Sequence, residues 1–258
     1  MGTRRYDMMK ISEREKISLL KKIIGILERH NIHYWLESGT LLGYMRNKKF
    51  IPWDLDIDIG SSEDIEDIKK LEDEFNREGM EFVFLTKKTE VYSPHINIFD
   101  KSIPKKSGFH GDILFFKDEG EETICNFLTR ENMIIRMADT INHALNGNNI
   151  KQGKISIGTM NKLILFFTIL PENIKKMLSG ILLKLDVTFA TKRRFIFKKV
   201  KTAYTQFYGI DVKIPEDAED HLLLAYGKKW RIPDKKARTS GEEFEIEKEG
   251  VKICKIKK

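Results

Sequence analysis

Cysteine is scarce in this chain of 258 residues, which contains only Cys125 and Cys254. Two cysteines that lie far apart and form no Cys-x-x-Cys pair exclude a disulfide framework and a cysteine-rich zinc module. The sequence also lacks an apolar run near the ~20 residues that a bilayer-spanning helix needs. Its N-terminal MGTRRYDMMK lacks a signal-peptide core. These absences predict a soluble protein in a reducing compartment, the cytoplasm.

Apolar residues, in contrast, are plentiful: 41% of the chain is hydrophobic and 16 residues are Phe. This content is enough to build a substantial core, and it excludes wholesale disorder. Because domains run to roughly 50–250 residues, we expect one compact body with a subdomain.

Positive charge is concentrated in the second half of the chain. Residues 1–120 contain 20 basic and 22 acidic residues, whereas residues 121–258 contain 26 and 17. Most of the excess lies in Lys151–Lys201, which has 12 basic residues against two acidic ones. This basic segment also carries the apolar runs LILFFTIL and GILLKL on either side of Pro171, a pattern that predicts two helices with a cationic face.

Hydrophobic periodicity predicts helices and strands in an irregular order. A capping box of Ser12 and Glu15 begins a helix with one apolar face, which should end near His30. The irregular order favours a mixed α/β or α+β fold. The strand candidates are YWLE, DLDIDIG, EFVFL, VYSPHINIF and GDILFF, and the further helix candidates cover 62–77, 127–145 and 215–227.

The strongest chemical signal is the alternation of acidic and apolar residues in Asp54-Leu55-Asp56-Ile57-Asp58. Side chains two residues apart on a strand point to the same face, so the three carboxylates can converge on one or two divalent cations. Oxygen ligands without a nearby cysteine favour Mg²⁺ or Mn²⁺ over zinc. The alternative interpretation is a polar edge strand whose acidic side chains are simply solvated.

A second signal is the turn Ser38-Gly39-Thr40, which lies between a strand-like and a helix-like segment. Backbone N–H groups and a hydroxyl at such a turn can bind a phosphate. Arg46 and Lys48 follow and could neutralise a diphosphate. Taken singly, the Gly-Thr pair fits an ordinary turn and the two cations fit solvated loop charges. Together with the aspartates, they are typical of a nucleotidyltransferase-type site.

A third carboxylate is expected as a further metal ligand or as a base for an incoming hydroxyl. Asp112 in GDILFF is our candidate because an apolar strand follows it, and Asp100 after HINIF is the competitor. His110 would share the face of Asp112 if the strand extends that far back, but we favour the interpretation that it is a loop histidine.

Three blocks of the sequence resemble the LicD/fukutin family of phosphotransferases. YWLESGTLLGYMRNKKFIPWDLDIDIG is similar to the family signature, GDILFF to the strand that carries a further aspartate, and FYGIDVKIPEDAEDHLLLAYGKKWRIP to the closing block. These blocks cover less than a third of the chain. The cysteine-rich zinc loop and membrane anchor of some animal members have no counterpart here, so bacterial-type members are the nearer relatives.

The resemblance implies a nucleotidyltransferase-like fold of the DNA polymerase β superfamily, with a mixed sheet flanked by helices and a helical C-terminal part. It implies metal-dependent transfer of a substituted phosphate, phosphocholine or a polyol phosphate such as ribitol phosphate, from a CDP-activated donor to a glycan hydroxyl. Asp56 and Asp58 would be metal ligands, Asp54 would support them, and Gly39 and Thr40 would contact the phosphates. The implied setting is polysaccharide or lipopolysaccharide biosynthesis.

We accordingly expect residues 1–120 to form the catalytic core and residues 121–233 to form a helical, basic part that completes the site on the acceptor side. Residues 234–258 would be a charged, flexible tail or an edge strand. In the expected reaction a glycan hydroxyl displaces CMP, with Asp56, Asp58 and Asp112 as catalytic residues. The alternatives are a true nucleotidyltransferase that releases pyrophosphate and a catalytically inactive binding protein on the same fold.

The basic segment Lys151–Lys201 admits three interpretations. It could contact an anionic membrane that presents a lipid-linked glycan, it could bind an anionic acceptor, or its lysines could be solvated around an apolar core layer. The first interpretation would place the protein peripherally at the inner membrane surface. Nucleic acid is not expected as a partner, because no helix-turn-helix or aromatic-interleaved basic platform is present.

Overall fold

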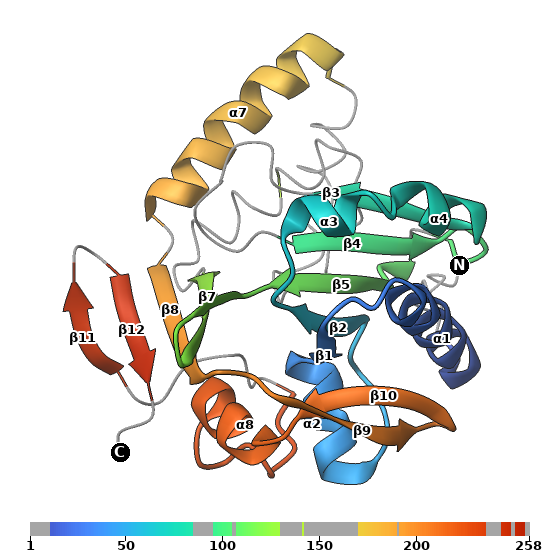
Figure 1. Cartoon of the computed structure of the whole chain (residues 1–258). Helices are drawn as coiled ribbons and strands as arrows, with labels where there is room; N and C mark the ends of the chain where they lie inside the picture. Colours follow the sequence, from blue (N-terminus) through green and yellow to red (C-terminus); the bar gives the residue numbers. More distant parts are fainter. Residues whose placement is uncertain are drawn as a thin grey trace, which may run out of the picture.

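The computed structural model describes residues 11–84, 95–104, 107–129, 141, 170–189, 191–235, 244–248 and 251–255 (Figure 1). Within these residues the fold is a mixed α+β arrangement in which helices flank a mixed sheet, as the irregular element order predicted. A second five-stranded sheet and a two-stranded hairpin accompany the first sheet.

The first sheet has the strand order β1-β2-β5-β4-β3. The central pair β2 and β5 is parallel, and the other neighbours pair antiparallel. All five expected strands of the N-terminal half are thus present, although the aspartate strand begins at Asp56 instead of Asp54. Their bounds are β1 Tyr34–Leu36, β2 Asp56–Ser61, β3 Met80–Phe84, β4 His95–Asp100 and β5 His110–Phe115.

Helix α1 (Glu13–Arg29) covers one face of this sheet. The predicted capping box is confirmed, since Ser12 and Glu15 bond each other's backbone N–H groups. The apolar face of α1 is buried, and a Cβ added to Gly111 on β5 would collide with Ile23 of this helix. Because strand side chains alternate, the residues next to Gly111 point to the opposite face. That face carries the acidic side chains.

The segment expected as one helix over 62–77 is two short helices, α3 (Ile65–Lys69) and α4 (Glu72–Arg77). The break falls at Leu71, whose N–H bonds Ile68 O three residues back, so the last turn of α3 tightens. Ile68, Leu71 and Phe75 are all buried. The break therefore keeps the apolar side chains of both helices in the core.

The second sheet corrects the prediction that residues 121–233 are mainly helical. Its order is β11-β12-β8-β7-β6, with β12 and β8 parallel. β7 occupies the start of the expected helix 127–145, whose remainder, apart from residue 141, lies outside the described residues. Of the two C-terminal strands, β11 lies at the edge of this sheet, one of the two predicted outcomes, whereas β12 lies inside it between β11 and β8. The bounds are β6 Lys117–Glu119, β7 Glu122–Thr129, β8 Thr191–Lys198, β11 Phe244–Lys248 and β12 Val251–Lys255.

The basic segment is helical only in part. Helix α7 (Glu172–Phe189) begins directly after Pro171, as predicted, but the chain then continues as strand β8. The first expected helix of this segment lies outside the described residues. In Figure 1, α7 extends away from both sheets. None of the helices in the described ranges has the length and apolarity to cross a membrane.

The hairpin of β9 (Thr202–Phe207) and β10 (Ile210–Pro215) turns through Tyr208 and Gly209, both in the left-handed region. Two consecutive residues of this kind make the primed turn that suits the twist of paired strands. Helix α8 (Ala218–Tyr226) begins three residues later than predicted because β10 extends to Pro215, and it ends before Gly227 as expected. It packs against α2 (Ser38–Asn47), β8 and β10.

Among the residues that the structure describes, two apolar clusters form the core. The larger lies between the first sheet, α1, the short helices and the β9–β10 hairpin. The smaller contains Trp35, Phe197, Leu224 and both cysteines, and it joins the second sheet to α8. Burial raises the pKa of the Cys125 thiol, so its environment does not favour the reactive thiolate form.

Candidate active site

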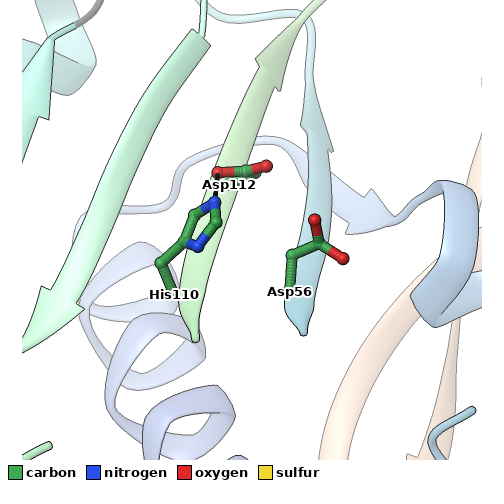
Figure 2. A group of neighbouring side chains, drawn as sticks. All are labelled: Asp56, His110 and Asp112. Carbon is green, nitrogen blue, oxygen red and sulfur yellow. Dashed lines mark ion pairs between the residues drawn. The ribbon is translucent and has the colours of Figure 1, made fainter. Parts of the chain in front are cut away.

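The acidic face of the first sheet is built by the parallel pair β2 and β5. Their register places Asp56 opposite His110 and Asp58 opposite Asp112. Figure 2 shows Asp56, His110 and Asp112 projecting from the two neighbouring strands toward one space. Residues separated by more than fifty positions in the sequence thus share one site because the strands are paired in this register.

Two groups of potential ligand atoms meet here among the described residues. In the first group, Asp56, His110 and Asp112 each offer one ligand atom, and these atoms lie within 4.8 Å of one another. In the second group, one carboxylate oxygen from each of Asp54, Asp56 and Asp58 lies within the same distance of the others. Asp56 belongs to both groups. Carboxylate oxygens with one imidazole nitrogen are a donor set suited to hard or borderline divalent cations. The predicted clustering of Asp54, Asp56, Asp58 and Asp112 is therefore present in space.

Asp54 reaches the site from a turn, since β2 begins only at Asp56. Its N–H bonds Ile51 O at 3.1 Å, and its carbonyl accepts a hydrogen bond from Lys16 Nζ at 2.6 Å. Burial lowers the pKa of Lys16, and the Asp54 and Asp56 carboxylates counteract only part of that shift. Sequence reasoning missed Lys16. The available signal was a lysine on the otherwise apolar face of the first helix.

His110 is buried, and contacts of its two ring nitrogens and of its ring face orient it. Its Nδ1 lies 2.8 Å from Gly108 O, and its Nε2 lies 3.1 Å from Asp112 Oδ1. A carbonyl oxygen only accepts, so Nδ1 carries a proton and Nε2 is the nitrogen that faces the carboxylates. The ring stacks on Phe99 at 5.3 Å between centroids. His110 therefore lies on β5 and belongs to the site, which corrects the favoured interpretation of a loop histidine.

Asp112 is further held by Asn97, whose side-chain amide donates to Asp112 Oδ1 from the neighbouring strand β4. The competing candidate, Asp100, pairs instead with Lys22 at 2.7 Å and accepts hydrogen bonds from Ser102. Burial raises the pKa of Asp100, but the bonds from Lys22 and Ser102 outweigh it, and the net shift is downward. The ion pair of Asp100 thus connects α1 to the end of β4.

The expected phosphate-binding turn is the first turn of helix α2. Gly39 N donates to Asp58 Oδ2 at 2.9 Å, and Thr40 Oγ1 accepts from Asp58 N at 2.8 Å. Ser38 N donates to the carboxylate of Glu37, the N-cap residue, at 3.0 Å. Ser38, Gly39 and Thr40 therefore lie beside the carboxylates as predicted, where two of them orient Asp58.

Arg46 and Lys48 lie at the other end of α2. With a rise of about 1.5 Å per residue, they are roughly 10 Å or more along the helix axis from Ser38–Thr40. Arg46 Nε donates to Trp230 O at 2.6 Å, and Arg46 Nη2 donates to Ile232 O at 3.0 Å. Lys48 Nζ lies 3.4 Å from the centre of the Tyr44 ring. The structure thus does not bring these two cations to the carboxylates. Arg46 instead joins the segment after α8 to helix α2 through these hydrogen bonds.

Comparison with known proteins supports the same region. The Haemophilus influenzae lipopolysaccharide cholinephosphotransferase LicD is 43% identical over 56 residues, 20% of this chain and 21% of that protein. The mouse ribitol-5-phosphate transferase FKTN is 24% identical over 229 residues, 89% of this chain and 36% of that protein. This chain therefore spans well under two thirds of either relative.

Among solved structures, the antibiotic-resistance factor ANT(2'')-Ia shares 11% identity and covers 69% of this chain and 96% of its own, with a TM-score of 0.32. Residues 31–144 match the family described as LicD/FKTN/FKRP, nucleotidyltransferase domain, and this range contains all five cation-ligand candidates. Over residues 31–144 the chain is therefore similar to the LicD/FKTN/FKRP nucleotidyltransferase domain.

Proposed function

We propose that this protein is a metal-dependent phosphotransferase of the LicD type. It moves a substituted phosphate, phosphocholine or a polyol phosphate, from a CDP-activated donor to a hydroxyl of a cell-surface glycan and releases CMP. The observation that carries the proposal is the convergence of Asp54, Asp56, Asp58, His110 and Asp112 on one face of β2 and β5. The names of the relatives supply the reaction class.

The donor set fits Mg²⁺ or Mn²⁺, because carboxylate oxygens dominate it. Such a cation would neutralise phosphate oxygens and the departing CMP. Asp54, Asp56 and Asp58 would hold it, and Asp56, His110 and Asp112 offer a second, overlapping set. Gly39 N–H and Thr40 Oγ1 would keep Asp58 in place for this task.

In the proposed reaction the oxygen of the glycan hydroxyl forms a bond to the phosphorus distal to the nucleoside. The bond between that phosphorus and the bridging oxygen breaks, and the bridging oxygen leaves as part of CMP. The hydroxyl proton passes to Asp112 or to solvent. Asn97 and His110 hold Asp112 at the site, which supports this role or a ligand role for its carboxylate.

We propose a fold of the nucleotidyltransferase type, related to the DNA polymerase β superfamily. Two features support this fold: the sheet is mixed, and its parallel pair β2 and β5 carries the carboxylates. Two of these carboxylates, Asp56 and Asp58, lie two residues apart on β2. The domain description of the matched family points the same way. Residues 1–120 would be the catalytic core, and α8 and the β9–β10 hairpin would close it from the C-terminal side.

The direct test is CMP release with Mg²⁺ from CDP-choline, CDP-ethanolamine, CDP-glycerol and CDP-ribitol, with and without a cell-surface glycan extract. We expect acceptor-stimulated CMP release from one donor. Asp56→Asn and Asp58→Asn should abolish it without unfolding the protein, whereas Asp73→Asn, an exposed aspartate on α4, should not change it. Full activity of both site variants would disprove the assignment.

A true nucleotidyltransferase is the second candidate, because the same carboxylates would serve attack at the inner phosphorus of a nucleoside triphosphate. Its product would be pyrophosphate instead of CMP. Pyrophosphate release with no CMP from any of the four donors would establish this alternative. Absence of turnover with all donors and triphosphates would favour the inactive binding protein.

We also propose peripheral contact with an anionic membrane that presents a lipid-linked glycan, which would place the protein at the cytoplasmic face of the inner membrane. Helix α7 exposes Met177 and Ile181, one turn apart, beside the exposed Lys176. Wild-type protein should sediment with phosphatidylglycerol vesicles at low salt and not with phosphatidylcholine vesicles. Failure to bind anionic vesicles would exclude this contact.

A further inference from the structure

A buried ionisable pair joins α8 to the start of α2. His221 Nε2 lies 2.8 Å from Glu37 Oε2, and the two side chains are only 1% and 3% exposed. Trp35 Nε1 donates to the same carboxylate oxygen at 2.6 Å. Glu37 belongs to the family-matched range, whereas His221 lies far beyond it.

The Glu37 carboxylate is stabilised as an anion in this apolar setting. Burial by itself raises the pKa of Glu37, but the interaction with His221 and the hydrogen bonds from His221, Trp35 and Ser38 N outweigh it, so the net shift is downward. Carboxylates that accept several hydrogen bonds remain ionised inside proteins. The negative charge also lies at the N-terminus of α2, where the helix dipole favours it.

The contact with Glu37 is the one polar contact of the His221 ring within the described part of the chain. Its other nitrogen, Nδ1, is buried and has no hydrogen-bond partner there. The ring stacks on Phe197 with 4.0 Å between centroids and 12° between planes, which fixes its orientation. A histidine held in this way is oriented toward a single acceptor, Glu37.

Glu37 in turn holds the backbone that orients Asp58. Its N–H bonds Asp58 O at 3.0 Å, and its carboxylate accepts from Ser38 N, a residue whose φ of 43° is uncommon outside glycine. The two residues after Ser38 then hold Asp58 through Gly39 N and Thr40 Oγ1. His221, Glu37, the α2 turn and Asp58 therefore form a continuous series of hydrogen-bonded groups.

We propose that His221 is a positioning residue of the cation site: by fixing the Glu37 carboxylate, it holds the first turn of α2 in the geometry that orients Asp58. The segment after the matched family domain thereby controls a carboxylate within that domain. The expected effect of His221 on catalysis rests on the proposed phosphotransfer function, whereas its expected effect on cation binding does not.

Three variants test this role. His221→Phe keeps a ring that can stack on Phe197 and removes the donor, whereas His221→Gln retains an amide donor near the position of Nε2. His33→Phe is the control, because His33 is a partly buried histidine whose ring contacts Trp35 but which bonds Ser62 and not Glu37. Each protein is titrated with Mn²⁺, melted, and measured for amide hydrogen exchange over residues 38–41.

Loss of supporting hydrogen bonds around metal ligands weakens metal binding by about 10- to 100-fold. We expect a loss of this size and faster exchange in residues 38–41 for His221→Phe, with recovery in His221→Gln and no change in His33→Phe. In the transfer assay, kcat should fall more than the donor KM changes. A lower melting temperature with unchanged Mn²⁺ affinity and exchange would reduce His221 to a core residue and overturn the proposal.

Wild-type Mn²⁺ binding without CMP release from any donor would refute the proposed function while leaving the positioning role open to the same titration. If His221→Phe does not fold, a comparison of the Mn²⁺ affinities of His221→Gln and Glu37→Gln tests the positioning role instead. Both are then expected to fold, and weaker Mn²⁺ binding only in Glu37→Gln would support the role. Equal, wild-type Mn²⁺ affinities in the two would contradict it.

Discussion

Gly39 of helix α2 lies so close to Asp54 that a Cβ atom on Gly39 would collide with Asp54 Oδ2. The same Cβ would lie 3.1 Å from Asp58 Oδ2. The helix and the acidic segment can therefore approach each other only because residue 39 has no side chain. The role of this glycine is close packing against carboxylates, in addition to any contact with phosphate.

Replacing Gly39 with alanine should displace the Asp54 carboxylate, because the carboxylate is the movable end of that contact. We expect the protein to fold, Mn²⁺ affinity to fall by about tenfold or more, and CMP release to fall with it. Isothermal titration with Mn²⁺ measures the first effect. Gly25→Ala in α1 is the control, since its Cβ would meet only Arg29 at 3.5 Å and alanine favours a helix by up to ~1 kcal/mol. Wild-type Mn²⁺ affinity in Gly39→Ala would contradict the packing argument.

His110→Ala tests whether the imidazole belongs to the cation site. Removing Nε2 leaves Asp56 and Asp112 as the remaining members of that group, so we expect Mn²⁺ binding to weaken by about 10-fold or more. The effect on Mg²⁺ should be smaller, because Mg²⁺ prefers oxygen ligands more strongly. His30→Ala, at the exposed end of α1, should leave both affinities unchanged. Equal losses for the two ions would mean that His110 acts only by orienting Asp112.

Two glycines of the central strands should differ in their tolerance of alanine. A Cβ on Gly60 would lie 2.5 Å from Trp35 ring atoms, and this ring is fully buried and bonded to Glu37. A Cβ on Gly111 would meet the terminal methyl of Ile23, which can change rotamer. We expect Gly60→Ala to lower the free energy of unfolding by about 1–3 kcal/mol, and Gly111→Ala by less. Urea unfolding measures both, and the reverse order would show that the Trp35 ring can move.

The ion pair of Asp100 should make the free energy of unfolding decrease at acid pH. Its pKa in the folded protein is lowered from the usual value of about 3.9, so the folded state binds its proton less readily than the unfolded chain. The stabilisation is then fully present above the unfolded pKa and is lost as pH falls through the lower, folded pKa. Asp100→Asn should be less stable than wild type at pH 7, and the difference should shrink below about pH 4. Urea unfolding at several pH values tests this, and a difference that stays constant would contradict it.

Local patterns in the sequence were sufficient for several parts of this description. The capping box of Ser12 and Glu15, the alternation around Asp56 and Asp58, and the helix start after Pro171 depend on neighbours within a few residues. Such patterns are readable because helix and strand periodicity is a local property. Composition was a poorer guide in the basic segment, where β8 follows α7 and pairs with β7 and β12. Strand pairing of that kind depends on distant partners.

The sequence by itself determined that two aspartates share one face of a strand and that a Ser-Gly-Thr turn precedes them. The tertiary structure decided which distant groups join them, because the parallel register of β2 and β5 brings His110 and Asp112 to Asp56 and Asp58. It also directed Arg46 to the carbonyls of Trp230 and Ile232, and His221 to Glu37. Those contacts depend on how buried side chains pack between elements far apart in the chain, and no local spacing encodes that packing.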